Sequence, residues 1–309
     1  MNDYPRVEAD ALLESDLRML VRLSIAEDLR DAMDWTTVCL IDADRQGGCE
    51  IVPRGEGVCA GMATLAWIVD EFDASLEVTC LQEDGSTLVA GQPIARLTGN
   101  ARDLLTCERT ILNILSRMCG VATQTRRYAQ EIASTKSRLY DTRKTTPGWR
   151  LLEKYAVGCG GGHNHRSGLH DGFLIKDNHL ALAGDSSGPL AASTAAKKAI
   201  QWRGANVEHL VAPNMVEIEV DSLEQFRDVI STNPDIILLD NFSLDALREA
   251  VAIRDRENSA VELEASGNVT IDTIADIATT GVERISCGAL THQATWLDLG
   301  FDWFDKTLS

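Results

Sequence analysis

The chain has 309 residues, of which 29 are basic and 47 acidic, and its formal net charge is −18. A hydrophobic content of 44% supplies an ordinary folded core and excludes a disordered chain. The acidic balance excludes nucleic acid and an anionic membrane as bulk partners, because both bind cationic surfaces. The acidic first 20 residues and the lack of a long apolar run predict a cytoplasmic protein.

The charge is distributed unevenly along the chain. Residues 102–177 carry 13 basic and 7 acidic groups, a net +6, whereas each flank carries a net −12. Such clustering indicates either an anion site or a chance grouping of surface lysines and arginines, and composition alone leaves both open.

The first 120 residues predict a small α+β domain. Apolar positions at helical spacing indicate helices over 9–30 and 61–72. Residues 49–59 are expected to contain strand material broken by Pro53, Gly55 and Gly57. Strands are expected over 76–81 and 88–97, separated by an Asp84-Gly85 turn. A strong apolar stripe predicts a helix over 102–118 that Gly120 ends, and a second helix over 121–133.

Six short apolar runs recur from residue 139 onward, each followed by a polar loop and a helical stretch. They cover residues 139–140, 173–175, 216–220, 236–239, 261–265 and 285–287. The last three begin 24–25 residues apart, which is the length of one βα unit. The pattern therefore predicts a parallel sheet or barrel of six to eight strands, and the aromatic end at 296–304 is expected to be a docking tail.

None of the eight cysteines forms a CxxC pair, and most are expected to be small buried apolar residues. Cys159, His163 and His165 have C-x3-H-x-H spacing. That spacing permits a zinc site, but no second cluster of ligands supports it.

Polar residues follow the predicted strands at the point where each strand ends. In a βα barrel these ends meet at one edge, where catalytic groups collect. The residues are Asp141, Thr142, Arg143, Lys144, Lys176, Asp177, Asn178, His179, Glu219, Asp240, Asn241, Ser266, Gly267, Asn268 and Gly288. So many in register favour a shared site over loops that are polar by chance.

The residue types at these positions indicate the substrate chemistry. Arginine forks bind carboxylates, lysine meets phosphate, and glycine turns expose backbone N–H groups to a phosphate. Glu219 and Asp240 are expected to hold a divalent metal or ribose hydroxyls, and His165 beside Arg166 is a further candidate substrate contact. The sequence thus predicts a reaction between a carboxylate-bearing compound and a phosphorylated sugar.

Seven segments carry a resemblance to a known family. They are ERTILNILSRMCGVAT (108–123), DTRKTTPGWR (141–150), GGGHNHRSGLHDGFLIKDNH (160–179), VEIEVDSLEQ (216–225), IILLDNFS (236–243), EASGNVT (264–270) and ISCGALTH (285–292). Together they resemble the quinolinate phosphoribosyltransferases, which transfer phosphoribosyl from phosphoribosyl pyrophosphate (PRPP) to quinolinate with loss of CO₂. That reaction gives nicotinate mononucleotide for NAD synthesis.

The resemblance implies the architecture. It implies an N-terminal α/β sandwich domain over 1–120, with the tail 290–309 packing back on it. It also implies an incomplete α/β barrel of the type II phosphoribosyltransferase kind over 121–289, and a homodimer.

The resemblance also implies residue roles. Arg109 would be donated across the dimer, and the quinolinate carboxylates would meet Arg143, His165 and Arg166, with Thr142, Lys144 and Lys176 nearby. Glu219 and Asp240 would bind the ribose of PRPP directly or through Mg²⁺, the implied cofactor. The 5′-phosphate would lie against Ser266, Gly267, Asn268 and Gly288. The catalytic set would be Lys144, as the candidate proton donor, with Lys176, Glu219 and Asp240.

The chain departs from the family pattern at Cys119, at Trp149 and in an expected insertion over 184–206. Three other functions stay open. One is a family paralogue with a different acceptor, and another is a barrel lyase that uses Lys176 as a Schiff base. The third is a carrier module, suggested by Gly91-Gln92-Pro93-Ile94.

Overall fold

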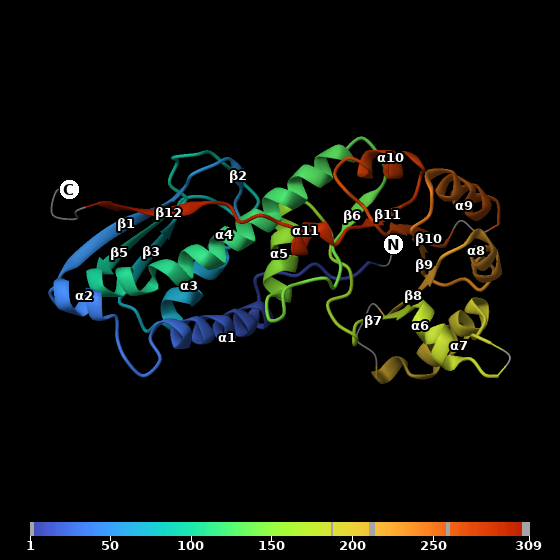
Figure 1. Cartoon of the computed structure of the whole chain (residues 1–309), viewed down its shortest axis with the longest axis horizontal. Coiled ribbons are helices and arrows are strands. Elements are labelled where there is room, and N and C mark those ends of the chain that lie inside the picture. The colour runs from blue at the N-terminus through green and yellow to red at the C-terminus, as the bar shows by residue number, and fades with distance from the viewer. Residues whose placement is uncertain (1–2, 187, 210–213, 258–259, 305–309) are drawn as a thin grey trace. The chain divides into compact units, whose positions relative to one another are not determined.

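The computed structural model describes residues 3–186, 188–209, 214–257 and 260–304. The chain forms two compact units, each described here by itself (Figure 1). The antiparallel-sheet unit comprises residues 6–126, 145–161 and the chain from 290 onward. The parallel-sheet unit comprises the chain up to residue 5 together with residues 127–144 and 162–289.

The antiparallel-sheet unit is built on a four-stranded sheet of order β12-β1-β5-β3 and a short β2-β4 pair. Its elements are α1 (Ala11–Asp28), α2 (Trp35–Leu40), β1 (Gln46–Pro53), β2 (Gly57–Val58), α3 (Met62–Glu71), β3 (Leu76–Cys80), β4 (Thr87–Leu88), β5 (Ala95–Asn100), α4 (Ala101–Glu131), α5 (Arg150–Gly160), α11 (Ala289–His292) and β12 (Leu299–Phe304). The helix α4 continues beyond residue 126, and α11 begins at the unit boundary. The tail strand β12 pairs antiparallel with β1, so the C-terminal segment belongs to this sheet.

Local sequence explains the helices of this unit. The Asp10 carboxylate accepts hydrogen bonds from the N–H groups of Leu12 and Leu13 and so caps α1. The apolar stripe of α1 then buries Leu13 and Leu17. The predicted helices at 9–30 and 61–72 are confirmed as α1 and α3. Among the described residues, none of the helices has the length and apolarity needed to cross a membrane.

Two predictions for this unit are wrong. Gly120 does not end a helix, and no separate helix covers 121–133, because α4 runs unbroken from Ala101 to Glu131. A Cβ at Gly120 would lie 2.2 Å from the carbonyl oxygen of Thr295, so glycine permits close packing here. The predicted strand 88–97 is two strands, β4 and β5, separated by a stretch that holds Gly91 at φ +80° and Pro93. Since β3 pairs with β5, the Asp84-Gly85 turn forms no hairpin between β3 and β4.

The parallel-sheet unit confirms all six predicted strands. Its elements are β6 (Arg138–Tyr140), β7 (Gly172–Ile175), α6 (Asp177–Ala183), α7 (Ala192–Ala205), a 3-10 turn (Val207–His209), β8 (Met215–Val220), α8 (Leu223–Ile230), β9 (Ile236–Asp240), α9 (Leu244–Glu257), β10 (Glu262–Ser266), α10 (Ile274–Thr279) and β11 (Arg284–Ser286). The strand order is β6-β11-β10-β9-β8-β7, and every neighbouring pair is parallel. Figure 1 shows α8, α9 and α10 outside the sheet. The expected insertion at 184–206 contains α7, which packs on α8 and β8.

The parallel sheet curves into an incomplete barrel, as predicted. Its edge strands are β6 and β7. The segment 163–166, here called the His-Arg loop, runs beside β6 through hydrogen bonds between His163 and the backbone of Leu139 and Asp141. The imidazole of His165 lies near side chains of both β8 and β10, which stand on either side of β9. The inner face of the sheet is therefore concave.

Candidate active site

All but one of the predicted site residues lie in the parallel-sheet unit, and most stand where its strands end. Those at strand ends are Thr142, Arg143 and Lys144 after β6, Lys176 after β7, Glu219 in β8, Asp240 in β9, Ser266, Gly267 and Asn268 at β10, and Gly288 after β11. Because the strands are parallel, these residues share one edge of the sheet, which we call the carboxyl edge. Arg109 lies on α4 in the antiparallel-sheet unit, where its side chain is exposed.

Acidic and basic groups meet at the carboxyl edge beside β8. The ammonium of Lys176 forms an ion pair with the carboxylate of Glu219. Asp240 ends the neighbouring strand β9 and is partly exposed, and its carboxylate accepts a hydrogen bond of 2.8 Å from the Asn241 amide. The two carboxylates thus stand on adjacent strands, near a lysine that offsets part of their charge.

The turns after β9 and β10 are locked together in an unusual backbone conformation. Asn241, Gly267 and Asn268 all have positive φ values, of 56°, 94° and 50°. The Asn268 amide donates to Oδ1 of Asn241 at 3.0 Å, and the Asn241 N–H donates to the Ser266 carbonyl at 2.9 Å. A Cβ at residue 267 would lie 2.2 Å from Asn241 Oδ1, so only glycine fits. Backbone turns of this kind form concave surfaces for anions.

The His-Arg loop is held in place by Asp141, which is fully buried. One Asp141 carboxylate oxygen accepts the His165 N–H at 2.8 Å, and the other accepts the Asn164 amide at 2.7 Å. Asp141 is the first residue of the predicted polar run 141–144, but no role of its own was predicted for it from the sequence.

His165 and Arg166 point into the barrel and are only 5% and 6% exposed. The Arg166 guanidinium donates to the Gly172 carbonyl oxygen at 3.2 Å, and the Arg166 N–H donates to Nδ1 of His165 at 2.8 Å. Arg143 is half-buried and Lys144 exposed, with the Lys144 N–H donating to the Thr142 hydroxyl at 3.0 Å. The predicted basic residues therefore lie in two places: His165 and Arg166 are buried inside the barrel, and Arg143 and Lys144 lie at the carboxyl edge.

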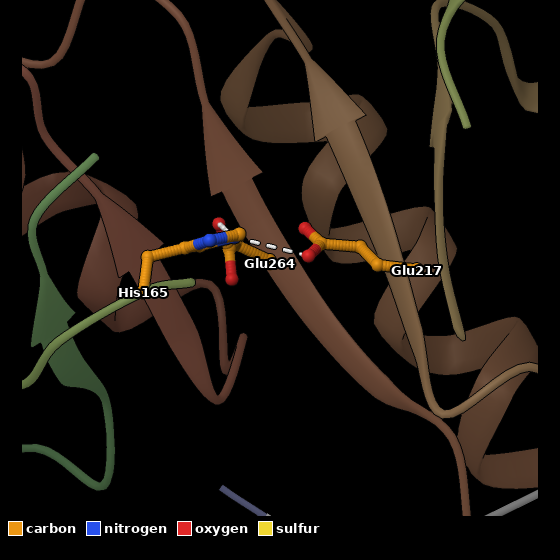
Figure 2. Close-up of side chains that lie close together, drawn as sticks. All are labelled: His165, Glu217 and Glu264. Atoms are coloured by element: carbon orange, nitrogen blue, oxygen red, sulfur yellow. Dashed lines mark ion pairs between the residues drawn. The ribbon is translucent and has the colours of Figure 1, made fainter. Parts of the chain in front are cut away.

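A buried charge cluster lies beneath the site. His165 Nε2 is 3.0 Å from a Glu217 carboxylate oxygen and 3.5 Å from one of Glu264 (Figure 2). The Arg284 guanidinium, fully buried, lies 2.8 Å from the other Glu264 oxygen. The sequence analysis missed Glu217, Glu264 and Arg284. The signal for the first was the alternation in Val-Glu-Ile-Glu-Val (216–220), which places Glu217 on the same face as Glu219.

The electrostatics of this cluster favour charged groups in spite of burial. Burial raises the pKa of Glu264, but His165 and Arg284 outweigh it and lower that pKa to about 2. Burial lowers the pKa of His165, but Glu217 and Glu264 raise it above the ordinary value. Nδ1 of His165 accepts the Arg166 N–H, which leaves Nε2 as the ring nitrogen that faces the two carboxylates.

One group of residues in the described part of the chain has metal-ligand geometry. Its members are His165, Glu217 and Glu264, whose ligating atoms lie within 4.8 Å of one another. The Arg284 guanidinium pairs with Glu264, whereas the buried Glu217 carboxylate faces the His165 imidazole and has no hydrogen-bond partner among the described residues. Neither Cys159 of the C-x3-H-x-H pattern nor the carboxylates of Glu219 and Asp240 belong to this group.

Comparison with known proteins covers almost the whole chain. The quinolinate phosphoribosyl transferase N-terminal domain matches residues 34–119, and the C-terminal domain of the same family matches residues 121–302. The nicotinate-nucleotide pyrophosphorylase (carboxylating) of Mycobacterium leprae is 41% identical over 288 residues, which are 92% of this chain and 96% of the relative.

Solved structures agree with this match. The nicotinate-nucleotide pyrophosphorylase of Francisella tularensis is 34% identical, with a TM-score of 0.84 over 98% of this chain and 100% of that one. The enzyme of the same name from Ehrlichia chaffeensis is 33% identical, with a TM-score of 0.80 over 93% of this chain and 98% of that one. From its sequence and from its fold, the chain belongs to the quinolinate phosphoribosyltransferase family.

Proposed function

We propose that this protein transfers the phosphoribosyl group of PRPP to quinolinate and releases pyrophosphate and CO₂, leaving nicotinate mononucleotide. The observation that carries the proposal is the carboxyl edge of the parallel sheet, where cations, two carboxylates and two glycine turns follow successive strands. Both substrates are strongly anionic, and this edge presents arginine and lysine side chains in an otherwise acidic protein. A cytoplasmic location is also part of the proposal.

The acceptor subsite is assigned to the cations near β6 and the His-Arg loop. Arg143 and Arg166 bind the two quinolinate carboxylates, with Thr142, Lys144 and Lys176 beside them. His165 lines the subsite, because its two ring nitrogens already face the Arg166 N–H and the buried carboxylates. Guanidinium groups suit this task because their planar donors match a carboxylate bidentately. Asp141 supports the subsite by holding the backbone of the loop that carries two of these residues.

The donor subsite is assigned to the other half of the edge. The N–H groups of the locked turns at Ser266, Gly267 and Asn268, with Gly288, bind the 5′-phosphate. Glu219 and Asp240 bind the ribose. These two partly exposed carboxylates on adjacent strands also fit Mg²⁺, which prefers one or two protein carboxylates together with water and substrate oxygens. When bound, Mg²⁺ supplies positive charge that stabilises the leaving pyrophosphate.

The reaction follows from this placement. The quinolinate nitrogen attacks C1 of the ribose as the bond from C1 to pyrophosphate breaks. Positive charge develops on the ribose, and the carboxylates of Glu219 and Asp240 stabilise it. The ring nitrogen then carries a positive charge, so the C2 carboxylate leaves as CO₂ and its electron pair remains at C2. A proton closes the reaction at C2, and Lys144 is the proposed donor. Holding the two reactants in line contributes several kcal/mol to lowering the barrier.

The Schiff-base alternative is disfavoured by the state of Lys176. Imine formation requires the Lys176 amine to reach a substrate carbonyl, whereas its nitrogen is held in an ion pair with Glu219. The paralogue alternative differs only in the acceptor, so it is decided by the assay below.

The homodimer is part of the proposal. We assign Arg109, exposed on α4, to the acceptor subsite of a second copy of the chain. A cation supplied in this way adds to the charge that binds the dianionic acceptor.

The test is turnover by the purified protein with quinolinate, PRPP and Mg²⁺. Nicotinate mononucleotide is expected with quinolinate and not with nicotinate as the acceptor. Arg143→Ala is expected to lose quinolinate turnover, whereas the matched control Arg227→Ala, an exposed arginine of α8 paired with Glu249, keeps it. Product from nicotinate but not from quinolinate, or full activity of Arg143→Ala, would refute the assignment.

A further inference from the structure

The chain close to its N-terminus lies inside the parallel-sheet unit rather than on its surface. The Tyr4 side chain is 5% exposed and packs with Met215 and Ile236, which stand at the amino ends of β8 and β9. Tyr4 therefore fills the barrel from the side opposite the carboxyl edge. The mechanism above makes no use of it.

Tyr4 contacts His165 directly and also contacts Gly172, the residue that anchors Arg166. Its ring stacks on the His165 imidazole, with 5.0 Å between centroids and 28° between planes. Its ring also lies against Gly172, the residue whose carbonyl accepts the Arg166 guanidinium. One aromatic ring thus lies under His165 and beside the anchor of Arg166.

The sequence makes room for this ring. A Cβ at Gly172 would lie 2.7 Å from the Tyr4 hydroxyl oxygen and 2.9 Å from its ring carbon Cε1. Contacts this short do not occur, so any larger residue at 172 would displace Tyr4. The glycine at position 172 is therefore what allows the Tyr4 ring to pack this closely.

The neighbouring residue Asp3 fastens the segment on the same side. Its carboxylate accepts the Tyr140 hydroxyl at 2.8 Å and pairs with Arg138 at 3.0 Å and with Arg284 at 3.1 Å. Arg284 in turn holds Glu264, which faces His165. Asp3 thereby connects the N-terminal segment to the buried charge cluster through Arg284, in addition to the stacking of Tyr4 on His165.

We propose that Tyr4 is a positioning residue for the acceptor subsite, which holds the His165 ring and the Gly172 anchor in place so that the His-Arg loop presents Arg166 to quinolinate. The inference rests on the proposed function. It assigns Tyr4 no contact with substrate. The ring provides the contact, because the Tyr4 hydroxyl has no hydrogen-bond partner among the described residues.

The first test is a set of steady-state measurements on the full-length enzyme. Tyr4→Leu keeps the apolar volume but loses the flat ring, and we expect its KM for quinolinate to rise about tenfold through the misplaced loop. Its KM for PRPP stays at the wild-type value. Tyr4→Phe, which keeps the ring, is expected to match the wild type in both constants. Phe226→Leu, at a buried position of α8 outside the sheet, controls for loss of stability and leaves the KM for quinolinate unchanged.

The second test uses the contact with Gly172. Gly172→Ala displaces the Tyr4 ring and is expected to raise the KM for quinolinate as Tyr4→Leu does. In a Tyr4→Leu background, which lacks the ring, adding Gly172→Ala has little further effect. This non-additivity separates positioning from general destabilisation. If Tyr4→Leu does not fold, the inference is tested with the other two variants. Gly172→Ala displaces the ring, and Tyr4→Phe retains it.

The inference is overturned if the KM for quinolinate stays unchanged in Tyr4→Leu or Gly172→Ala. It is also overturned if the KM values for quinolinate and PRPP rise together, or if Phe226→Leu produces the same rise. Absence of quinolinate turnover by the unmodified enzyme is a different result, because it refutes the proposed function itself.

Discussion

Replacing Arg284 by methionine tests whether the buried charge cluster holds the barrel together. Arg284 is fully buried, with its guanidinium 2.8 Å from the buried Glu264 carboxylate and 3.6 Å from the centre of the Tyr140 ring. Methionine fills similar space without the charge, so the Glu264 carboxylate loses its cation and stays buried. Breaking a buried ion pair in this way costs about 3–5 kcal/mol.

The lowered pKa of Glu264 points in the same direction, because both His165 and Arg284 stabilise its charged form. Since His165 remains in the variant, we expect Arg284→Met to lower the free energy of unfolding by about 3 kcal/mol, the lower end of that range.

The assay is urea unfolding followed by circular dichroism and tryptophan fluorescence. The double variant Arg284→Met/Glu264→Gln removes both charges and is expected to be more stable than Arg284→Met alone. Arg227→Met, which breaks an exposed ion pair on α8, is the matched control and should cost less than about 1 kcal/mol. A loss below about 1 kcal/mol for Arg284→Met, or a double variant no more stable than the single, would refute this reasoning.

Four further predictions concern Gly120, Gly267, the pH dependence of Glu264 and the proposed dimer. Gly120→Ala should lower the melting temperature, because its Cβ would meet the Thr295 carbonyl at 2.2 Å, and a rise would show that helix propensity dominates instead. Gly267→Ala should raise the KM for PRPP about tenfold or more and leave the KM for quinolinate near its wild-type value, and equal changes in both would contradict the donor-subsite assignment. The pKa of Glu264 is lowered, so its stabilisation is complete above pH 4.5 and is lost as the pH falls toward 2; melting curves from pH 5 to pH 3 should therefore drop less steeply in Glu264→Gln than in the wild type. Mixed Arg109→Ala and Lys176→Ala chains should recover activity through hybrid dimers, and no recovery despite proven subunit exchange would count against a shared site.

Much of the parallel-sheet unit could be predicted because its signals are local. Each strand is a short apolar run, and the repeat of one βα unit indicates a parallel sheet whatever the tertiary contacts. The polar residues at strand ends follow from the same pattern. For this reason the carboxyl edge could be assembled from the sequence.

The features that the sequence did not reveal depend on contacts between distant residues. Gly120 has the local appearance of a helix stop, and only the approach of Thr295 shows why glycine stands there. The Glu264–Arg284 pair joins two neighbouring strands inside the barrel. The two residues are far apart in the sequence, so the order of charges along the chain does not reveal that they pair. Tyr4 precedes the first helix and has no periodicity around it, so its burial under His165 could not be predicted.

The central claim is tested most directly by one stoichiometric measurement. The purified protein is given PRPP, Mg²⁺ and quinolinate labelled in its C2 carboxylate, and labelled CO₂, pyrophosphate and nicotinate mononucleotide are counted together. The account predicts equal amounts of all three, with the label entirely in CO₂. Pyrophosphate and nucleotide without labelled CO₂, or no consumption of quinolinate, would contradict it.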